Sequence, residues 1–363
     1  MNPFWHKLFG RLKDLPGDAP RSPGLALLAA LATAAAAGYG LGARARRGLY
    51  RRGLLRVRRL PAPVWSVGNL TVGGTGKTPV TACLARHLQN RGRRVAILSR
   101  GYGGDCRSVT RISDGSSLYA RPPAVGEEAY LLARSLPGVA VYTGASRYEA
   151  GMAAWRDLKP DLFLLDDGFQ HFQLYRDLDL VLLDAAAPFG NGALLPRGPL
   201  REPASALAAA QVLILTRFLG GRDDATPLNL KKAFPAKTVL TAAILPVVAR
   251  HYPRGGESAP GTLAGLPLYA FAGLARPRLF ADTLAGLGVD LKGFQAFPDH
   301  HRFSLEELEG LVRQARDRQA AALITTAKDW ARLGEQWDQE PPLWVLEVEA
   351  RLPEVDRLWG FLS

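Results

Sequence analysis

Cysteine is nearly absent from this sequence of 363 residues, which holds only Cys83 and Cys106. Two cysteines are too few for a disulfide framework, and their spacing matches neither a metal site nor a CxxC motif. A reducing compartment is therefore expected, and neither cysteine is assigned a function. The sequence shows no internal repeat and no low-complexity tract outside one alanine-rich run. A hydrophobic content of 47% excludes general disorder and predicts a packed core.

Acidic residues are scarce in the first 60 positions, which carry twelve lysines and arginines against only Asp14 and Asp18. The other 303 residues are close to balance, with 34 basic and 31 acidic side chains. Such an asymmetry is typical of a basic arm that binds nucleic acid, or of an anchor at a membrane surface.

Charge is wholly absent from residues 24–43, GLALLAALATAAAAGYGLGA. A helix of this length, rising ~1.5 Å per residue, spans roughly the 30 Å of a bilayer core. Its hydrophobicity is modest, so a soluble core helix and a cleaved signal peptide remain alternatives. Eight arginines at 44–59 favour an anchor with a cytoplasmic basic collar that attracts anionic lipids. Because Tyr50 is the only aromatic residue in that basic run, we expect no nucleic acid partner.

After Pro61 and Pro63, short apolar runs alternate with helical stretches, a pattern typical of βαβ units in a mostly parallel sheet. Strands are predicted near 64–67, 94–98, 139–142, 161–166, 179–184 and 211–216, and helices near 77–91, 126–136, 146–158 and 203–210. Two long extended runs, 238–252 and 342–352, bracket a second alternation of strands and helices.

We therefore predict an α/β fold, a P-loop NTPase-like doubly wound sheet with a smaller α/β lobe on a two-stranded hinge and an N-terminal membrane helix. The predicted parts are an N-terminal anchoring helix and basic collar at 1–60, a P-loop kinase core at 61–237, hinge strands at 238–250 and 342–352, and the smaller lobe at 251–341.

A glycine-rich stretch, SVGNLTVGGTGKTPV at 66–80, lies between a predicted strand and a predicted helix. Glycine lets backbone N–H groups close around phosphate oxygens, and the helix N-terminus adds partial positive charge. The strict pattern G-x-x-x-x-G-K-[ST] fails at Thr71, but Gly76-Lys77-Thr78 is intact. An apolar run ending in Asp166-Asp167 supplies the second carboxylate that meets the Mg²⁺ of a bound nucleotide. Together these motifs predict nucleotide hydrolysis or phosphoryl transfer.

Six motifs together resemble one family, the tetraacyldisaccharide 4′-kinases of Gram-negative bacteria. They are SVGNLTVGGTGKTPV, SRGYGG (99–104), DDGFQH (166–171), LLPRGPLREP (194–203), FPDHHRFS (297–304) and TTAKDWARL (325–333). The resemblance covers nearly the whole chain, and the first phosphate-loop glycine is missing in that family too. It implies a monotopic enzyme on the cytoplasmic face of the inner membrane. Such an enzyme transfers the γ-phosphoryl group of ATP to the 4′-hydroxyl of a tetraacyldisaccharide 1-phosphate, with Mg²⁺, and we expect it to be a monomer.

The resemblance also implies roles for individual residues. The nucleotide would be bound by Gly73, Gly74, Thr75, Gly76, Lys77, Thr78, Gln170 and His171. The Mg²⁺ ligands would be Thr78 and Asp166. Catalysis would depend on Lys77, Arg147, Asp167, Arg201 and a base, Glu127, supported by His300.

The chain departs from the family at the base itself. Gly126-Glu127-Glu128-Ala129 stands where the family usually has Gly-Asp-Glu-Pro, so Glu127 is one methylene longer than the expected aspartate. A misplacement of ~1 Å can cost roughly 100-fold in rate. Either Glu127 works in a shifted loop, or Glu128 takes the role, or the activity is impaired. We favour Glu127, and keep a membrane-associated P-loop ATPase and a catalytically impaired nucleotide- or lipid-binding relative as alternatives.

Overall fold

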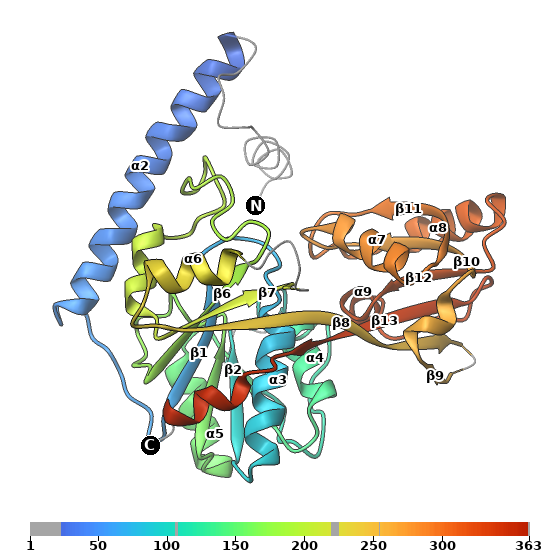
Figure 1. Ribbon diagram of the computed structural model, residues 1–363. Helices are drawn as coiled ribbons and strands as arrows, with labels where there is room; N and C mark the ends of the chain where they lie inside the picture. Colours follow the sequence, from blue (N-terminus) through green and yellow to red (C-terminus); the bar gives the residue numbers. More distant parts are fainter. Residues whose placement is uncertain (1–22, 106–107, 219–224, 254, 362–363) are drawn as a thin grey trace. The chain divides into compact units, whose positions relative to one another are not determined.

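The computed structural model describes residues 23–105, 108–218, 225–253 and 255–361 (Figure 1). The predicted N-terminal region is therefore described only from residue 23, and Cys106 lies outside the described residues. The chain divides into two compact units. The first comprises residues 1–77, 162–243 and 352–363, and the second comprises residues 78–161 and 244–351.

The first unit is built on a parallel sheet in the order β8-β7-β6-β1-β5. Its strands are β1 (Val64–Asn69), β5 (Leu162–Asp166), β6 (Leu178–Asp184), β7 (Val212–Thr216) and the first part of β8 (Thr238–Tyr252). Every residue of β1, β5, β6 and β7 is buried. Continuous apolar runs of this kind form parallel strands that are covered on both faces, which is why the sequence pattern identified them.

Helices complete the first unit. They are α2 (Pro23–Arg51), α6 (Ala225–Ala233) and the 3₁₀ helices η1 (Ala204–Ala209) and η4 (Val355–Phe361). The predicted α-helix at 203–210 is instead the short η1, because its end closes with a 3₁₀-type bond from the Ala210 N–H to the Leu207 carbonyl. Helix α2 buries Ala32 and Ala36 and exposes Leu27 and Leu31. Within the described residues it is the one helix long and apolar enough to cross a bilayer.

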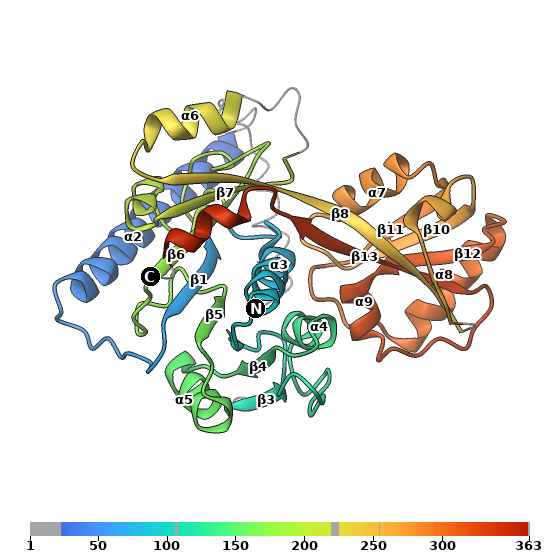
Figure 2. The same ribbon diagram turned by 60° about the horizontal axis from the view of Figure 1, so that its bottom comes forward.

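The second unit carries two groups of strands (Figure 2). In the first group, β2 (Val95–Ser99) runs parallel to β4 (Ala140–Thr143), and β3 (Thr110–Ser113) runs antiparallel to β4. The accompanying helices are α3 (Lys77–Asn90), α4 (Glu127–Ser135) and α5 (Arg147–Leu158). Strand β3 was not predicted, because its four residues include the charged Arg111 and give no clear apolar run.

The second group is a parallel sheet in the order β11-β10-β12-β13, with β13 beside β8. Its strands are β10 (Pro267–Ala272), β11 (Asp290–Ala296), β12 (Ala322–Thr326) and β13 (Leu343–Arg351), and the short β9 (Glu257–Ser258) pairs antiparallel with β8. Its helices are η3 (Pro260–Leu263), α7 (Pro277–Gly286), α8 (Leu305–Asp317) and α9 (Ala327–Arg332). A capping box between Ser304 and Glu307 fixes where α8 begins.

Candidate functional site

The glycine-rich stretch forms a loop between β1 and α3. Gly73 and Gly76 have φ angles of 102° and 83°, in the left-handed region that strongly favours glycine. Inside the loop, the Asn69 amide Nδ2 donates to the Thr71 carbonyl at 2.7 Å and to the Thr75 hydroxyl at 2.9 Å. Outside it, the Val72 N–H donates to the Pro199 carbonyl at 2.8 Å. Side-chain and backbone contacts therefore hold the loop where glycine at position 71 is missing.

A cluster of charges lies beside this loop. The Lys77 ammonium is 3.7 Å from Asp167 Oδ1, and the Arg201 guanidinium donates to both oxygens of Asp167 at 2.9 and 3.0 Å. Asp167 also has a φ of 54°, a conformation that is uncommon for a residue with a side chain and that often occurs at functional sites. Two cations and one carboxylate thus meet at the end of β5, where an anionic ligand would find two positive charges.

Asp166 is the carboxylate whose position fits a magnesium ligand. It is the last residue of β5, pairs in register with Val67 of β1 just before the loop, and is only 2% exposed. Magnesium is usually bound by one or two carboxylates together with substrate phosphates and waters, so a single buried carboxylate at this strand end suits it. The Asp167 carboxylate is instead bound by the two cations described above.

Helix α2 is joined to the same region by a buried ion pair. Arg47 donates to both Glu202 oxygens at 2.8 and 2.7 Å, and the Gln170 amide donates to Glu202 at 3.3 Å and to the Asn69 carbonyl at 2.9 Å. The Tyr39 hydroxyl donates to the Arg201 carbonyl at 2.9 Å. Helix α2 is therefore hydrogen-bonded to Glu202, whose partner Gln170 contacts Asn69, and to the backbone of Arg201.

Replacing Glu202 with glutamine should lower the stability of the first unit by about 2 kcal/mol, because Arg47 loses the charge that its partly buried guanidinium faces. A shift of roughly 5 °C in the melting temperature follows. The matched control is Glu349→Gln, since Glu349 pairs with Arg86 at the surface. Equal shifts in the two variants, measured by thermal unfolding in detergent, would refute a special role for the buried pair.

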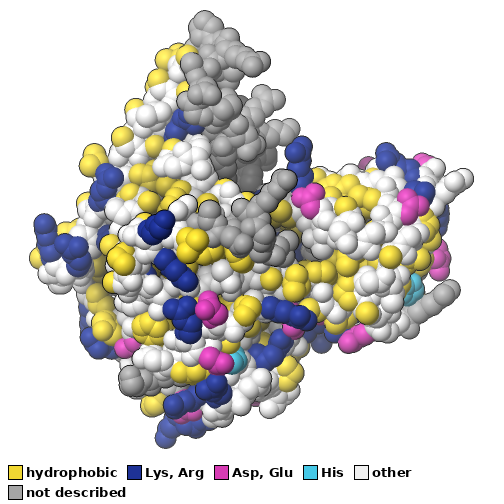
Figure 3. All heavy atoms as spheres, in the orientation of Figure 1, with side chains coloured by type: hydrophobic (Ala, Val, Ile, Leu, Met, Phe, Trp, Pro, Cys, Tyr) yellow, Lys and Arg dark blue, Asp and Glu magenta, His cyan; other side chains and the backbone are white. Residues whose placement is uncertain are grey.

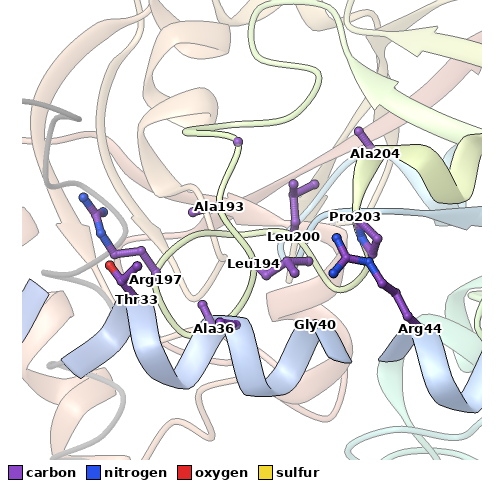
Figure 4. Close-up of a pocket in the computed structure, with 12 residues that line it drawn as sticks. Thr33, Ala36, Gly40, Arg44, Ala193, Leu194, Arg197, Leu200, Pro203 and Ala204 are labelled. Atoms are coloured by element: carbon purple, nitrogen blue, oxygen red, sulfur yellow. The ribbon is translucent and has the colours of Figure 1, made fainter. Parts of the chain in front are cut away.

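A shallow pocket of about 350 Å³ lies between α2 and the 192–204 segment (Figure 4). Its floor is apolar, with Ala36 and Gly40 of the helix opposite Leu194 and Leu200. Arg44 and Arg197 add two positive charges to its lining. This combination suits an amphiphile with an anionic head group.

In the second unit, Glu127 and His300 lie in contact. His300 Nδ1 is 2.5 Å from Glu127 Oε1, and the Arg332 guanidinium donates to the same oxygen at 2.9 Å. Arg332 also donates to Asp329 at 3.0 Å and to the Gly273 carbonyl at 2.7 Å, so its position is fixed. Within the described residues no hydrogen bond is made to Glu127 Oε2, which faces Gly103. One oxygen is thus held firmly, and the other is available to a ligand.

The surroundings of Glu127 decide its ionisation. Burial disfavours the carboxylate, but the hydrogen bond from His300 and the charge of Arg332 outweigh it and lower the pKa of Glu127 to about 2. The hydrogen bond to Glu127 raises the pKa of His300, against the opposing effect of burial. At neutral pH, Glu127 is therefore ionised and able to accept a proton.

The contribution of this pair to stability should depend on pH. Because the pKa of His300 is raised above its ordinary 6.5, the stabilisation is complete below pH 6.5 and is lost as pH rises through the folded value. The melting-temperature difference between wild type and His300→Gln should narrow between pH 5.5 and pH 9. A difference that stays constant over that range would contradict the ion pair. The Glu127 contribution is present above its ordinary pKa of 4.5 and is lost as pH falls from there through about 2, outside this window.

The neighbouring Glu128 has a different partner. Its carboxylate forms an ion pair with Lys328, whose pKa is raised because Glu128 outweighs the effect of burial. Glu127 is thus paired with His300, and Glu128 with Lys328.

The remaining predicted residues lie at helix starts or in a turn. Arg147 is the first residue of α5, is buried, and donates to the Ala145 carbonyl at 3.3 Å. Thr78 is in the first turn of α3. His171 follows Gln170 in the turn after β5, and its carbonyl accepts from Arg176 at 2.9 Å.

A family model described as tetraacyldisaccharide-1-P 4′-kinase matches residues 28–363. The chain belongs to this family. The resemblance seen in the motifs is thereby confirmed, and so is the α/β fold with a mostly parallel sheet.

Relatives that carry the family name match most of the chain. A tetraacyldisaccharide 4′-kinase from Anaeromyxobacter sp. (strain Fw109-5) is 44% identical over 340 residues, which cover 91% of this chain and 90% of the relative. One from Geobacter sulfurreducens is 42% identical over 354 residues, covering 96% and 94%. A crystal structure of LpxK from Aquifex aeolicus in complex with ATP superposes with a TM-score of 0.72 at 31% identity, covering 92% of this chain and 98% of that one.

The motifs identified the residues of two contacting clusters, but not the side chains that hold these residues in place. Lys77, Asp167 and Arg201 meet in the first unit, and Glu127 meets His300 in the second. Sequence reasoning missed the side chains that hold them, which are Asn69, Glu202 and Arg332. Each lies inside or beside a quoted motif, so closer attention to polar residues within the motifs could have found them.

Proposed function

We propose that this chain transfers the γ-phosphoryl group of ATP to the 4′-hydroxyl of a tetraacyldisaccharide 1-phosphate, a step of lipid A biosynthesis. Its membership of the 4′-kinase family across residues 28–363 carries the proposal. The chain is thus an ATP-dependent phosphotransferase with an alcohol acceptor, and ATP and Mg²⁺ are its cofactors. Neither the ATPase nor the catalytically impaired relative has support from the family match.

Lys77, Arg201 and the loop backbone up to residue 77 are the phosphate-binding groups of this proposal that lie in the first unit. Phosphoryl transfer places negative charge on the β- and γ-phosphates, and catalysis depends mainly on positioning and on neutralising that charge. Lys77 and Arg201, now paired with Asp167, would turn to the phosphates, while backbone N–H groups of residues 73–77 bind the oxygens. We assign Arg147 the same task of steadying the transferring group, because its charge is buried at a helix start.

Thr78 and Asp166 would hold the magnesium ion. The bound ion would supply positive charge that neutralises part of the charge on the phosphates. The buried carboxylate of Asp166 at the end of β5 supports this assignment, and the pairing of Asp167 with two cations favours Asp166 over its neighbour.

Glu127 is the base in this proposal. As the sugar oxygen bonds to phosphorus and the bond to ADP breaks, Glu127 Oε2 accepts the hydroxyl proton. His300 and Arg332 hold Oε1 and so orient the carboxylate. The longer side chain of glutamate reaches both partners, which supports Glu127 over Glu128 and over a loss of activity.

The same proposal includes a place at the membrane. Figure 3 shows hydrophobic side chains along α2, and Leu27, Leu31 and Leu41 are among the exposed ones. We place α2 in the inner membrane as an anchor, with its arginines at anionic head groups and the rest of the chain on the cytoplasmic face as a monomer. The pocket beside Arg44 and Arg197 would then take part of an acyl chain of the substrate.

A single assay separates the kinase from its rivals. The purified chain in detergent micelles is given ATP with and without the tetraacyldisaccharide 1-phosphate. A kinase releases ADP in step with phosphorylated lipid and only when lipid is present. ATP turnover without lipid would identify an ATPase, and ATP binding without any product would identify an impaired relative.

A further inference from the structure

Arg217 contacts the phosphate loop from a distant part of the sequence. It follows β7, and its guanidinium donates twice to the Gly74 carbonyl, at 2.9 and 2.7 Å. The same side chain donates to Asp184 Oδ2 at 2.7 Å. Asp184 is the last residue of β6, is 4% exposed, and also accepts from the Ala186 N–H at 3.1 Å. The Asp184 carboxylate at the end of β6 therefore holds the Arg217 guanidinium, and the guanidinium holds the Gly74 carbonyl of the loop.

The contact has a direct effect on backbone geometry. A peptide bond is planar and trans, so fixing the Gly74 carbonyl toward Arg217 turns the N–H of Thr75 to the opposite side. Gly74 has no left-handed φ, and a Cβ at this position would meet nothing within 4 Å. The permissive backbone of glycine therefore does not by itself fix the orientation of the Gly74–Thr75 peptide. The orientation of this peptide thus depends on the guanidinium.

The backbone of Arg217 has an uncommon conformation. Its φ is 58°, in the left-handed region that is unfavourable for a residue with a Cβ. Among the described residues Lys159, Asp167, His300, Gln319 and Glu335 also have a positive φ, and two of these, Asp167 and His300, lie at the predicted parts of the site. Strain of this kind persists where the surrounding contacts determine the conformation.

We propose that Asp184 and Arg217 form a brace that sets the orientation of the Gly74–Thr75 peptide for nucleotide binding. Both are positioning residues, because they act through the loop backbone. The brace fixes the loop conformation, a task to which the strict phosphate-loop pattern contributes a glycine at position 71. The inference rests on the proposed nucleotide site, and it adds two residues that the motifs did not indicate.

The test measures ATP and ADP binding by fluorescent-nucleotide titration, together with steady-state kinetics, for Arg217→Ala and Asp184→Asn. Two hydrogen bonds from a charged donor are lost in Arg217→Ala, so KM for ATP should rise roughly 10- to 100-fold while KM for the lipid is unchanged. ADP affinity should fall by the same factor, because the loop holds more than the γ-phosphate. The double variant should bind no more weakly than Arg217→Ala alone, since the two residues act as one unit.

The Asp184→Asn variant distinguishes an indirect effect of Arg217, through the loop backbone, from a direct contact of Arg217 with the phosphates. If Arg217 attracted phosphate by its own charge, removing the negative charge of Asp184 would leave ATP affinity unchanged or improve it, and this result would overturn the proposal. Arg357→Ala is the control, because Arg357 also joins a carboxylate to a backbone carbonyl, at Glu354 and Val239, away from the loop. An equal rise of both KM values with a lower melting temperature would indicate general damage and would also count against the brace. Nucleotide binding needs no lipid, so wild-type chain that binds ATP without forming product would contradict the kinase and leave this test intact.

Discussion

Replacing Lys77 with alanine is expected to lower phosphoryl transfer by roughly 1,000-fold, since a preorganised charge at the transferring group is among the largest contributions to such catalysis. In the structure the Lys77 ammonium lies beside Asp167, at the start of the helix that follows the phosphate loop. Its loss removes one of the two cations in that cluster. Product formation from labelled ATP measures the effect.

The fold should survive this change. The Lys77 side chain is partly buried but its one described ion pair is long, at 3.7 Å, so the melting temperature should move little. Lys232→Ala, at an exposed position of α6, provides a control that should keep full activity. Purified Lys77→Ala protein that retains normal transfer would remove the phosphate-loop assignment.

Glu127→Gln should lower kcat by roughly 100- to 10,000-fold, the range that a general base contributes. Glutamine keeps the length of the side chain but cannot accept the hydroxyl proton. It also leaves Arg332 and His300 facing a neutral group. KM for ATP should change little, because Glu127 is assigned to the acceptor hydroxyl and not to the nucleotide.

Two further variants test which of the two carboxylates is the base. Glu128→Gln should retain most of the activity, because Glu128 is paired with Lys328, whereas Glu127 is the carboxylate paired with His300. Glu127→Asp shortens the side chain and withdraws Oε1 from both His300 and Arg332, so a loss of roughly 100-fold is expected. If Glu128→Gln were the inactive variant, the roles of the two carboxylates would have to be exchanged.

Much of the fold could be predicted because its strands are buried on both faces. Runs such as VWSVGN and LVLLD are mainly apolar, and the structure buries every residue of β1 and β6. Elements without such a run were missed. The mixed strand β3 at Thr110–Ser113 and the polar helix α6 at Ala225–Ala233 gave no periodic signal. The boundaries of the predicted parts, including the hinge strands, stay a prediction.

Site residues inside a recognised motif could be predicted, whereas contacts between distant parts of the sequence could not. Lys77 begins the helix after the loop that follows β1, Asp167 directly follows β5, and these two strands pair in the sheet, so their meeting follows from topology. Arg217 lies 143 residues from Gly74, and neither residue's neighbourhood in the sequence indicates the other. The same holds for Arg332 and Glu127, 205 residues apart. Local sequence thus identifies the reacting groups, whereas their supports depend on tertiary packing.

The most direct test of the account is phosphoryl transfer from γ-labelled ATP to a tetraacyldisaccharide 1-phosphate, with wild type and Glu127→Asp assayed side by side. The account predicts robust wild-type product and a slower Glu127→Asp variant, because His300 and Arg332 are placed for glutamate. No wild-type product, restored by the aspartate, would contradict it and would show a family member whose chemistry has been lost.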